Sequence, residues 1–382
     1  MAVRRLIVSD LHFGSGDDLL RSPEALERIE PELAWCDELV INGDCFELVF
    51  SSLTEAVDAS RSFFDLAARR VESIVILPGN HDHHLVSLAT DMRRLAEATG
   101  ADPGEPFRVE PAERLLRHLA PGVRVLAPYP ICELDGLRIT HGHYIAPHLE
   151  SFGWQMMDRL SWGLTGSPRR TRGLEVADYE ALIAPLYDLM YSMANLPAGR
   201  QAQVNFERWL VAAASLVRAP TKASRQVVSF VHSLLRHDRR EELLQQIDAP
   251  TSSVLAAMEA VCENLQIPAG EVTFGHTHTP LAAAAGPSGR WTFHNSGSWM
   301  YDRRMRGQAH YRDLAWPGTV LRATGGDVEV RRLLDDLTET DLHAMVGSVS
   351  DPKRRRRLRA AARRREPVLR TPVCRVTAPD SA

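Results

Sequence analysis

The chain is poor in cysteine and has no long apolar run. Its five cysteines, at positions 36, 45, 132, 262 and 374, are scattered, odd in number and contain no Cys-x-x-Cys pair. This argues against a disulfide framework and against a zinc knuckle, and favours a reducing compartment. No stretch reaches the roughly 18 apolar residues of a membrane span. The first apolar run ends after Val8, too early for a signal-peptide core. We therefore expect a cytoplasmic protein.

The chain also lacks a basic body. Its formal net charge is −4, and nine of the positive charges lie between Lys353 and Arg365, which leaves about −13 for the rest. An acidic body argues against broad electrostatic binding of nucleic acid, so no stable nucleic-acid complex is expected. The same charge suits the binding of cations.

The positive charge is concentrated near the C-terminus. Residues 352–366 form a block of like charges, followed by a tail that contains proline. Blocks of this kind are usually solvated and often disordered, which is how we interpret residues 346–382. The alternative is contact with an anionic surface, which would place the protein at the inner face of a membrane.

Residues 4–143 alternate between short apolar runs and helical stretches, a pattern typical of a layered α/β architecture. Asp135-Gly136 predicts a tight hairpin turn within it. The expected strands cover 5–9, 38–42, 73–77, 123–126, 131–134 and 137–140, and the expected helices cover 23–35, 54–70 and 86–99.

Residues 144–270 are almost wholly helical in pattern. Apolar side chains recur there at i, i+3, i+4 and i+7, so we interpret this part as a helical insertion in the α/β domain. Strand patterns then return, which assigns 1–143 and 271–345 to one domain. The helical stripes run through 176–195, 203–217, 227–235 and 252–265, and the later strands are expected at 271–274, 290–294, 319–323 and 327–331.

Four short runs of metal-binding side chains each follow an apolar strand pattern. A sheet can gather residues that follow its strands at one edge. A lone Asp-x-His or Gly-Asp pair is weak evidence, because such short motifs are mostly structural. Together, however, the four predict a two-metal hydrolytic site. They are Ser9-Asp10-Leu11-His12, Asn42-Gly43-Asp44, Gly79-Asn80-His81-Asp82 and Gly275-His276-Thr277-His278.

The types of ligand indicate the metal and the reaction. Carboxylate and imidazole together suit Mn²⁺, Fe or Zn²⁺ better than Ca²⁺. We expect two divalent ions, with Mn²⁺ as the first choice. Two ions about 3.5–4 Å apart can hold a phosphoryl group and activate a bridging water. The expected reaction is therefore hydrolysis of a phosphoester or pyrophosphate bond by a metal-bridging hydroxide, in a phosphorylated small molecule or a nucleotide-type substrate.

With His141 added, the ordered series Asp-x-His, Gly-Asp, Gly-Asn-His-Asp, His and Gly-His-x-His resembles the calcineurin-like metallophosphoesterase superfamily. The resemblance covers about 1–143 and 271–300. It implies a four-layer αββα sandwich, here with a helical insertion, and seven metal ligands. One ion would be held by Asp10, His12 and His278, the other by Asn80, His141 and His276, with Asp44 bridging both.

The resemblance also implies a catalytic role for His81, which would stabilise the charge of the scissile phosphate or protonate the leaving group. Glu47 stands where many family members have an acid that orients this histidine, so it would fix the tautomer of His81. A solvated glutamate near a helix start is the alternative for Glu47.

The residues themselves support some of these roles. Asp44 is the only carboxylate close to the turn glycine in its loop, and Gly43 and Gly79 allow a close backbone path. In a regular strand His276 and His278 would point in opposite directions. They must therefore lie on a loop that bends, or serve different metals.

Three further histidines stay open at this point. His143 is a substrate contact or simply a loop histidine. For His83 and His84 the alternatives are a phosphate contact or an exposed position beside the motif.

The substrate is open as well. Gly43-Asp44-Cys45-Phe46-Glu47 looks like the form found in UDP-2,3-diacylglucosamine diphosphatases, which carry a helical lid in the position of this insertion. However, that family often has Arg where this chain has His81, and this insertion is longer than the usual lid. A lipid-precursor hydrolase is therefore one alternative to a general phosphoesterase. A non-catalytic scaffold that binds a protein partner is another.

Overall fold

The computed structural model describes residues 2–105, 107–149, 171–196, 251–302, 305–308 and 310–349. The insertion helices expected at 203–217 and 227–235 lie outside these residues, as does the basic segment 352–366. Within the described part of the chain, no helix is long and apolar enough to cross a bilayer.

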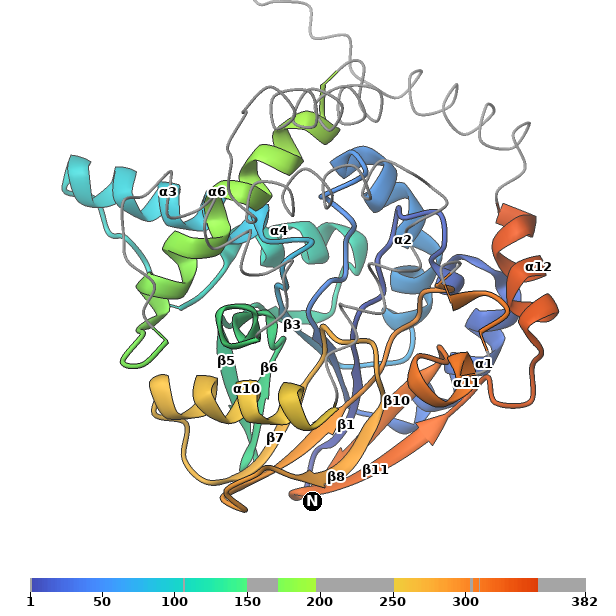
Figure 1. The fold of residues 1–382 in the computed structure, drawn as a ribbon. Helices are drawn as coiled ribbons and strands as arrows, with labels where there is room; N and C mark the ends of the chain where they lie inside the picture. Colours follow the sequence, from blue (N-terminus) through green and yellow to red (C-terminus); the bar gives the residue numbers. More distant parts are fainter. Residues whose placement is uncertain are drawn as a thin grey trace, which may run out of the picture.

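The first sheet has six strands and a parallel centre (Figure 1). β1 to β4 run parallel to one another, and β10 pairs antiparallel with β1. Every residue of β3 is buried, which explains its unbroken apolar sequence, since a central parallel strand is covered on both faces. In spatial order the strands are β11 (Asp327–Arg332), β10 (Thr319–Thr324), β1 (Arg4–Val8), β2 (Glu38–Asn42), β3 (Ser73–Leu77) and β4 (Arg124–Leu126).

The second sheet has five strands and combines the end of the N-terminal region with residues 270–295. β5 and β6 form the predicted hairpin, and Asp135 and Gly136 at its turn have φ of 51° and 85°. β6, β7 and β9 then run parallel. The order is β5 (Ile131–Leu134), β6 (Leu137–Thr140), β7 (Gly270–Phe274), β9 (Trp291–Asn295) and β8 (Leu281–Ala285).

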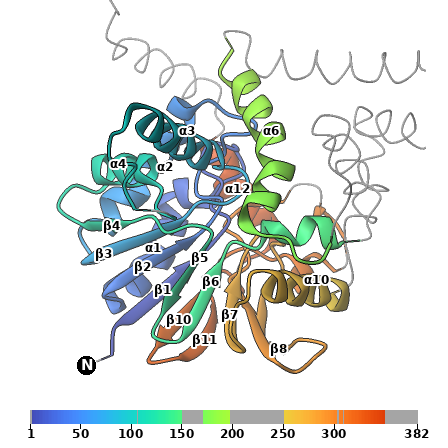
Figure 2. The same ribbon diagram turned by 90° about the vertical axis from the view of Figure 1, so that its left-hand side faces the viewer.

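The two sheets face one another across an apolar layer, and helices cover their outer faces (Figure 2). The expected four-layer αββα sandwich is therefore confirmed. Side chains between the sheets include Ile7, Val40, Val75, Leu137, Ile139 and Leu321. The helices that pack on the first sheet include α1 (Pro23–Trp35), α2 (Leu53–Ala67), α4 (Glu110–Leu119) and α12 (Glu339–Val349).

One helix expected in the insertion belongs to the sandwich. α10 (Thr251–Asn264) buries Met258 and Val261 in the cluster that covers β7 and β9. The other helices in the described part of the insertion are η2 (His143–His148) and α6 (Val176–Ala194). α6 packs beside α3 (His84–Thr99), as both views show (Figures 1 and 2). At the other end of the sandwich, α12 runs to Val349, past the expected boundary at 345.

Several elements were not expected from the sequence. α4 has few apolar residues and many charged ones, so its helical stripe is weak. Glu113, on its buried side, is bound by Arg108 and Arg117. β8 is mostly alanine, a weak strand former that pairing with β9 holds extended. α11 (Tyr311–Leu314), a single turn, and η1 (Leu19–Arg21), a short helix before α1, were not expected either.

Candidate metal centre

The expected ligands all follow strand ends at one edge of the sandwich. β1, β2 and β3 are parallel neighbours, so the loops after them leave the same edge of the first sheet. β6 and β7 do the same in the second sheet. Asp10 and His12 follow β1, Asp44 follows β2, Asn80 and His81 follow β3, His141 follows β6, and His276 and His278 follow β7.

The ligand loops have an unusual backbone. Five of the seven expected ligands adopt a positive φ, a region that residues other than glycine rarely occupy. Such strain persists only where the surroundings hold it, and it is frequent at functional sites. The φ angles are 54° for Asp10, 45° for His12, 50° for Asp44, 65° for His276 and 59° for His278. The bend expected between the last two histidines is therefore present.

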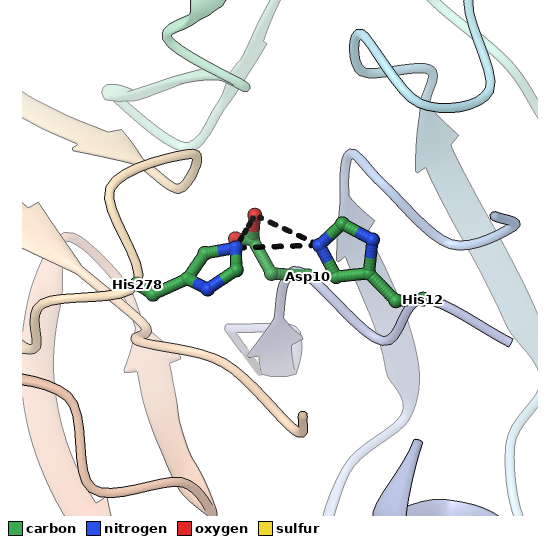
Figure 3. Close-up of side chains that lie close together, drawn as sticks. All are labelled: Asp10, His12 and His278. Atoms are coloured by element: carbon green, nitrogen blue, oxygen red, sulfur yellow. Dashed lines mark hydrogen bonds and ion pairs between the residues drawn. The ribbon is translucent and has the colours of Figure 1, made fainter. Parts of the chain in front are cut away.

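Asp10, His12 and His278 form one group of converging ligand atoms (Figure 3). Nε2 of His278 lies 3.2 Å from Oδ1 of Asp10 and 3.3 Å from Nε2 of His12. Nε2 of His12 lies 3.9 Å from the same Asp10 oxygen. Asp10 and His12 are buried. Three donor atoms from two sheets thus face one small volume.

Asp44, His141 and His276 form a second group, which Asn80 completes. Oδ1 of Asn80 lies 3.1 Å from Nε2 of His141 and 2.8 Å from Nδ1 of His276. Oδ2 of Asp44 lies 3.3 Å from Nε2 of His141 and 3.8 Å from Nε2 of His12. Asp44 therefore touches both groups, and His276 and His278 belong to different ones.

In His141 and His12 the Nδ1 atom faces away from the ligand cluster and has a hydrogen-bond partner, which leaves Nε2 to face the cluster. Nδ1 of His141 donates to the backbone oxygen of Asn42 at 2.9 Å, and Nδ1 of His12 lies 3.2 Å from Oε2 of Glu47. With the proton on Nδ1, each Nε2 presents a lone pair to the centre. Burial lowers the pKa of His141, but the carboxylate of Asp44 raises it to about 9. Without a cation, a proton would take the metal's position there.

Residues 3–176 match the family model described as calcineurin-like phosphoesterase. This match supports the metallophosphoesterase superfamily. No curated protein matches it. His276 and His278 lie beyond the matched residues, and the fold carries them to the edge where the matched ligands lie.

Within the matched region, His81 and Glu47 lie together beside the expected metal ligands. Nδ1 of His81 is 2.8 Å from both oxygens of Glu47, and the backbone N–H of His81 donates to Oδ1 of Asp44 at 2.8 Å. Burial lowers the pKa of His81, but Glu47 and Asp44 raise it to about 10. Burial raises the pKa of Glu47, whereas His81 and His12 lower it to about 2. Glu47 is 3% exposed, so it is not a solvated surface residue.

The α/β core also buries residues whose position was open. His83 is fully buried and its Nε2 lies 2.7 Å from Oε2 of Glu180, so an exposed position for it is wrong. His143 is buried too, with Nε2 3.2 Å from the hydroxyl of Tyr129. His84 is partly buried and stacks on Tyr191, with ring centroids 3.5 Å apart.

Three contributors were not assigned from the sequence. Asp82 accepts backbone N–H groups from Gly79 and from Cys45 and Phe46, and so ties the loops after β2 and β3 together. Glu180 and Tyr187 come from α6, and Tyr187 hydrogen-bonds to the expected ligand Asn80. The fourth position of Gly-Asn-His-Asp could have indicated Asp82, whereas Glu180 and Tyr187 follow the ordinary pattern of a helix.

Proposed function

We propose that this chain hydrolyses a phosphoester or pyrophosphate bond with two divalent cations. One cation is assigned to Asp10, His12 and His278 and the other to Asn80, His141 and His276, with Asp44 shared. The position of one oxygen carries the proposal. Oδ2 of Asp44 faces Nε2 of His12 at 3.8 Å and Nε2 of His141 at 3.3 Å, as a bridging carboxylate must.

The donor set fits cations because, without a positive charge between them, its lone pairs would repel one another. Nε2 atoms of His12 and His278 face one another at 3.3 Å, and Nε2 of His141 faces two oxygens. Lone pairs directed at one another repel unless a proton or a metal ion lies between them. When bound, divalent ions supply Lewis acidity and a lowered pKa of coordinated water. Imidazole with carboxylate suits Mn²⁺, Fe or Zn²⁺.

His81 is assigned to the leaving group. Its Nδ1 donates to Glu47, which leaves Nε2 to carry a second proton, and the negative charge of Glu47 favours this doubly protonated form. The hydrogen bond from its backbone N–H to Asp44 holds the main chain of His81 against the ligand cluster. The imidazole side chain is 23% exposed, so a substrate can reach it. His81 would donate to the scissile phosphate or protonate the departing oxygen.

The lipid-precursor alternative rests on the Gly-Asp-x-Phe-Glu form and on a helix near the site. Phe46 of that form is fully buried against Phe64 in the core, so it explains packing and does not select a substrate. For this reason we keep the general phosphoesterase as the proposal.

Turnover of bis-p-nitrophenyl phosphate and p-nitrophenyl phosphate with added Mn²⁺ tests the proposal against a non-catalytic scaffold. We expect release of p-nitrophenol that Asp44→Ala and His81→Ala abolish. No turnover by the unaltered chain, or turnover that both variants retain, would sink the enzymatic proposal. UDP-sugar lipids assayed in parallel test the lipid-precursor alternative.

A further inference from the structure

Phe50 is an exposed aromatic residue at the candidate metal centre. Its side chain is 52% exposed, although it lies in the loop that carries Asp44 and Glu47. Its ring centroid is 6.1 Å from that of His81, with the planes inclined at 57°. Single exposed apolar residues are common on protein surfaces. Phe50 differs from them by standing next to the proposed proton donor.

The backbone around Phe50 is held in place. Its N–H donates to Oε1 of Glu47 at 3.1 Å, the same carboxylate that holds His81. Two residues earlier, the N–H of Leu48 donates to the backbone oxygen of His81 at 3.1 Å. On the other side, the hydroxyl of Ser51 donates to the backbone oxygen of Gly14 at 2.6 Å.

The fixed backbone has a consequence for the ring. Leu48 and Val49 are buried and Ser52 caps α2, so neither end of the segment is free to turn the ring inward. The backbone that carries the exposed ring is therefore fixed relative to His81. Positioning in advance lowers the entropic cost of binding a partner.

We infer that Phe50 binds an aromatic group on the departing alcohol of the substrate. The inference rests on the proposed function. In that reaction a water oxygen bonds to phosphorus, the bond from phosphorus to the departing oxygen breaks, and His81 supplies the proton to that oxygen. A group attached to the oxygen next to His81 therefore lies near Phe50. Aromatic pairs gain more than the burial of apolar area alone, so an aromatic group on that oxygen would gain most from this ring.

Leaving groups of equal reactivity test the inference. 2-Phenylethyl, n-hexyl and ethyl phosphate all release primary alcohols, so they differ in what the enzyme binds and little in the chemistry. For the unaltered protein with Mn²⁺, we expect kcat/KM to be about tenfold higher for the phenylethyl ester than for the ethyl ester. The hexyl ester should fall between them. Methyl diesters of the same alcohols serve if the diester is the better class of substrate.

Variants then assign the preference to the ring. Phe50→Ala should bring the phenylethyl to ethyl ratio to within about twofold of unity, and Phe50→Tyr should keep it. Phe107→Ala is the matched control, because Phe107 is 59% exposed and lies outside the ligand loops. It should keep the ratio of the unaltered protein.

Different failures have different meanings. A ratio unchanged in Phe50→Ala overturns the inference, as does a parallel loss for all esters, which would make Phe50 a structural residue. Equal rates for the hexyl and phenylethyl esters would overturn the aromatic class. No metal-dependent turnover of any ester would remove the proposed function, and this inference with it.

Discussion

The backbone of Gly43 lies directly against the ring of His141. A β-carbon added at Gly43 would be 2.0 Å from Nδ1 of His141, and one at Gly79 would be 2.3 Å from Oδ1 of Asp44. Side chains from the two sheets therefore meet across glycines. The ligand positions depend on how closely the chain can pass at these points.

Gly43→Ala should displace His141 and weaken metal binding. The position has φ of 85°, so alanine there is strained by about 1–2 kcal/mol, and the contact with the ring adds to that strain. We expect at least a tenfold loss of metal affinity, measured by titration with Mn²⁺, together with a lower melting temperature.

Gly100→Ala separates backbone strain from the contact. Gly100 ends α3 with φ of 70°, and a β-carbon there would meet nothing within 4 Å. This variant should lose stability and retain metal binding. Equal metal affinity of the two variants would contradict the role of Gly43.

Asp44→Asn should remove the shared ligand and preserve the shape of the side chain. The amide oxygen can still accept the N–H of His81, while the group that replaces Oδ2 faces His12 and His141 without negative charge. We expect fewer than two metal ions per chain by elemental analysis, and a loss of about 10³ in kcat/KM. The matched control is Asp37→Asn, which alters an exposed pair with Arg4. Full metal content in Asp44→Asn would argue against a bridging role.

The sequence predicts much of this centre because its ligands occur in short, ordered strings after strand patterns. Asp10, Asp44, Asn80 and His141 each follow an apolar run that the structure shows as a buried strand. Parallel strands deliver such residues to one edge, so proximity follows from the pattern alone.

Other features depend on contacts that no local pattern encodes. Glu47 could be expected to hold His81, but its contact with His12 requires the loops after β1 and β2 to meet. His83 stands in a polar string and is nevertheless buried, because Glu180 from α6 reaches it from 97 residues away. α10 carries a helical stripe that fits an insertion equally well, and only the packing on β7 assigns it to the sandwich.

Glu47→Gln should shift the alkaline limb of the pH–rate profile to lower pH. Glu47 is the first of the carboxylates that raise the pKa of His81, against the lowering effect of burial. Glutamine keeps the size of the side chain and removes its charge, so the pKa of His81 falls. A proton donor is lost as pH rises through its pKa, and activity should therefore decline at a lower pH than in the unaltered protein.

Glu47→Gln should also lower kcat/KM, and Glu72→Gln serves as its control. His12 also loses its charged partner, and outer partners of metal ligands are typically worth 10–100-fold in activity or affinity. Glu72→Gln alters an exposed glutamate in the same region of sequence and should leave the profile in place. An unshifted alkaline limb in Glu47→Gln would mean that another group is titrated.

Glu180→Gln should loosen α6 from the metal centre. The carboxylate of Glu180 is bound by Nε2 of His83 at 2.7 Å and by the hydroxyls of Tyr129 and Tyr144. Loss of its charge weakens three partly buried hydrogen bonds at once, so we expect a loss of about 1–3 kcal/mol in the free energy of unfolding. Because α6 also carries Tyr187 against Asn80, kcat/KM should fall as well.

A second acid of α6 shows whether this effect is specific to the buried network. Asp188 lies 3.3 Å from His84, and its side chain is 40% exposed. Exposed pairs contribute about 0–1 kcal/mol, so Asp188→Asn should change stability less than Glu180→Gln. Hydrogen exchange then tests the location. In Glu180→Gln, the amides of α6 should exchange faster while those of β1 to β3 keep their protection. A uniform loss of protection would show that Glu180 supports the whole fold and not the position of one helix.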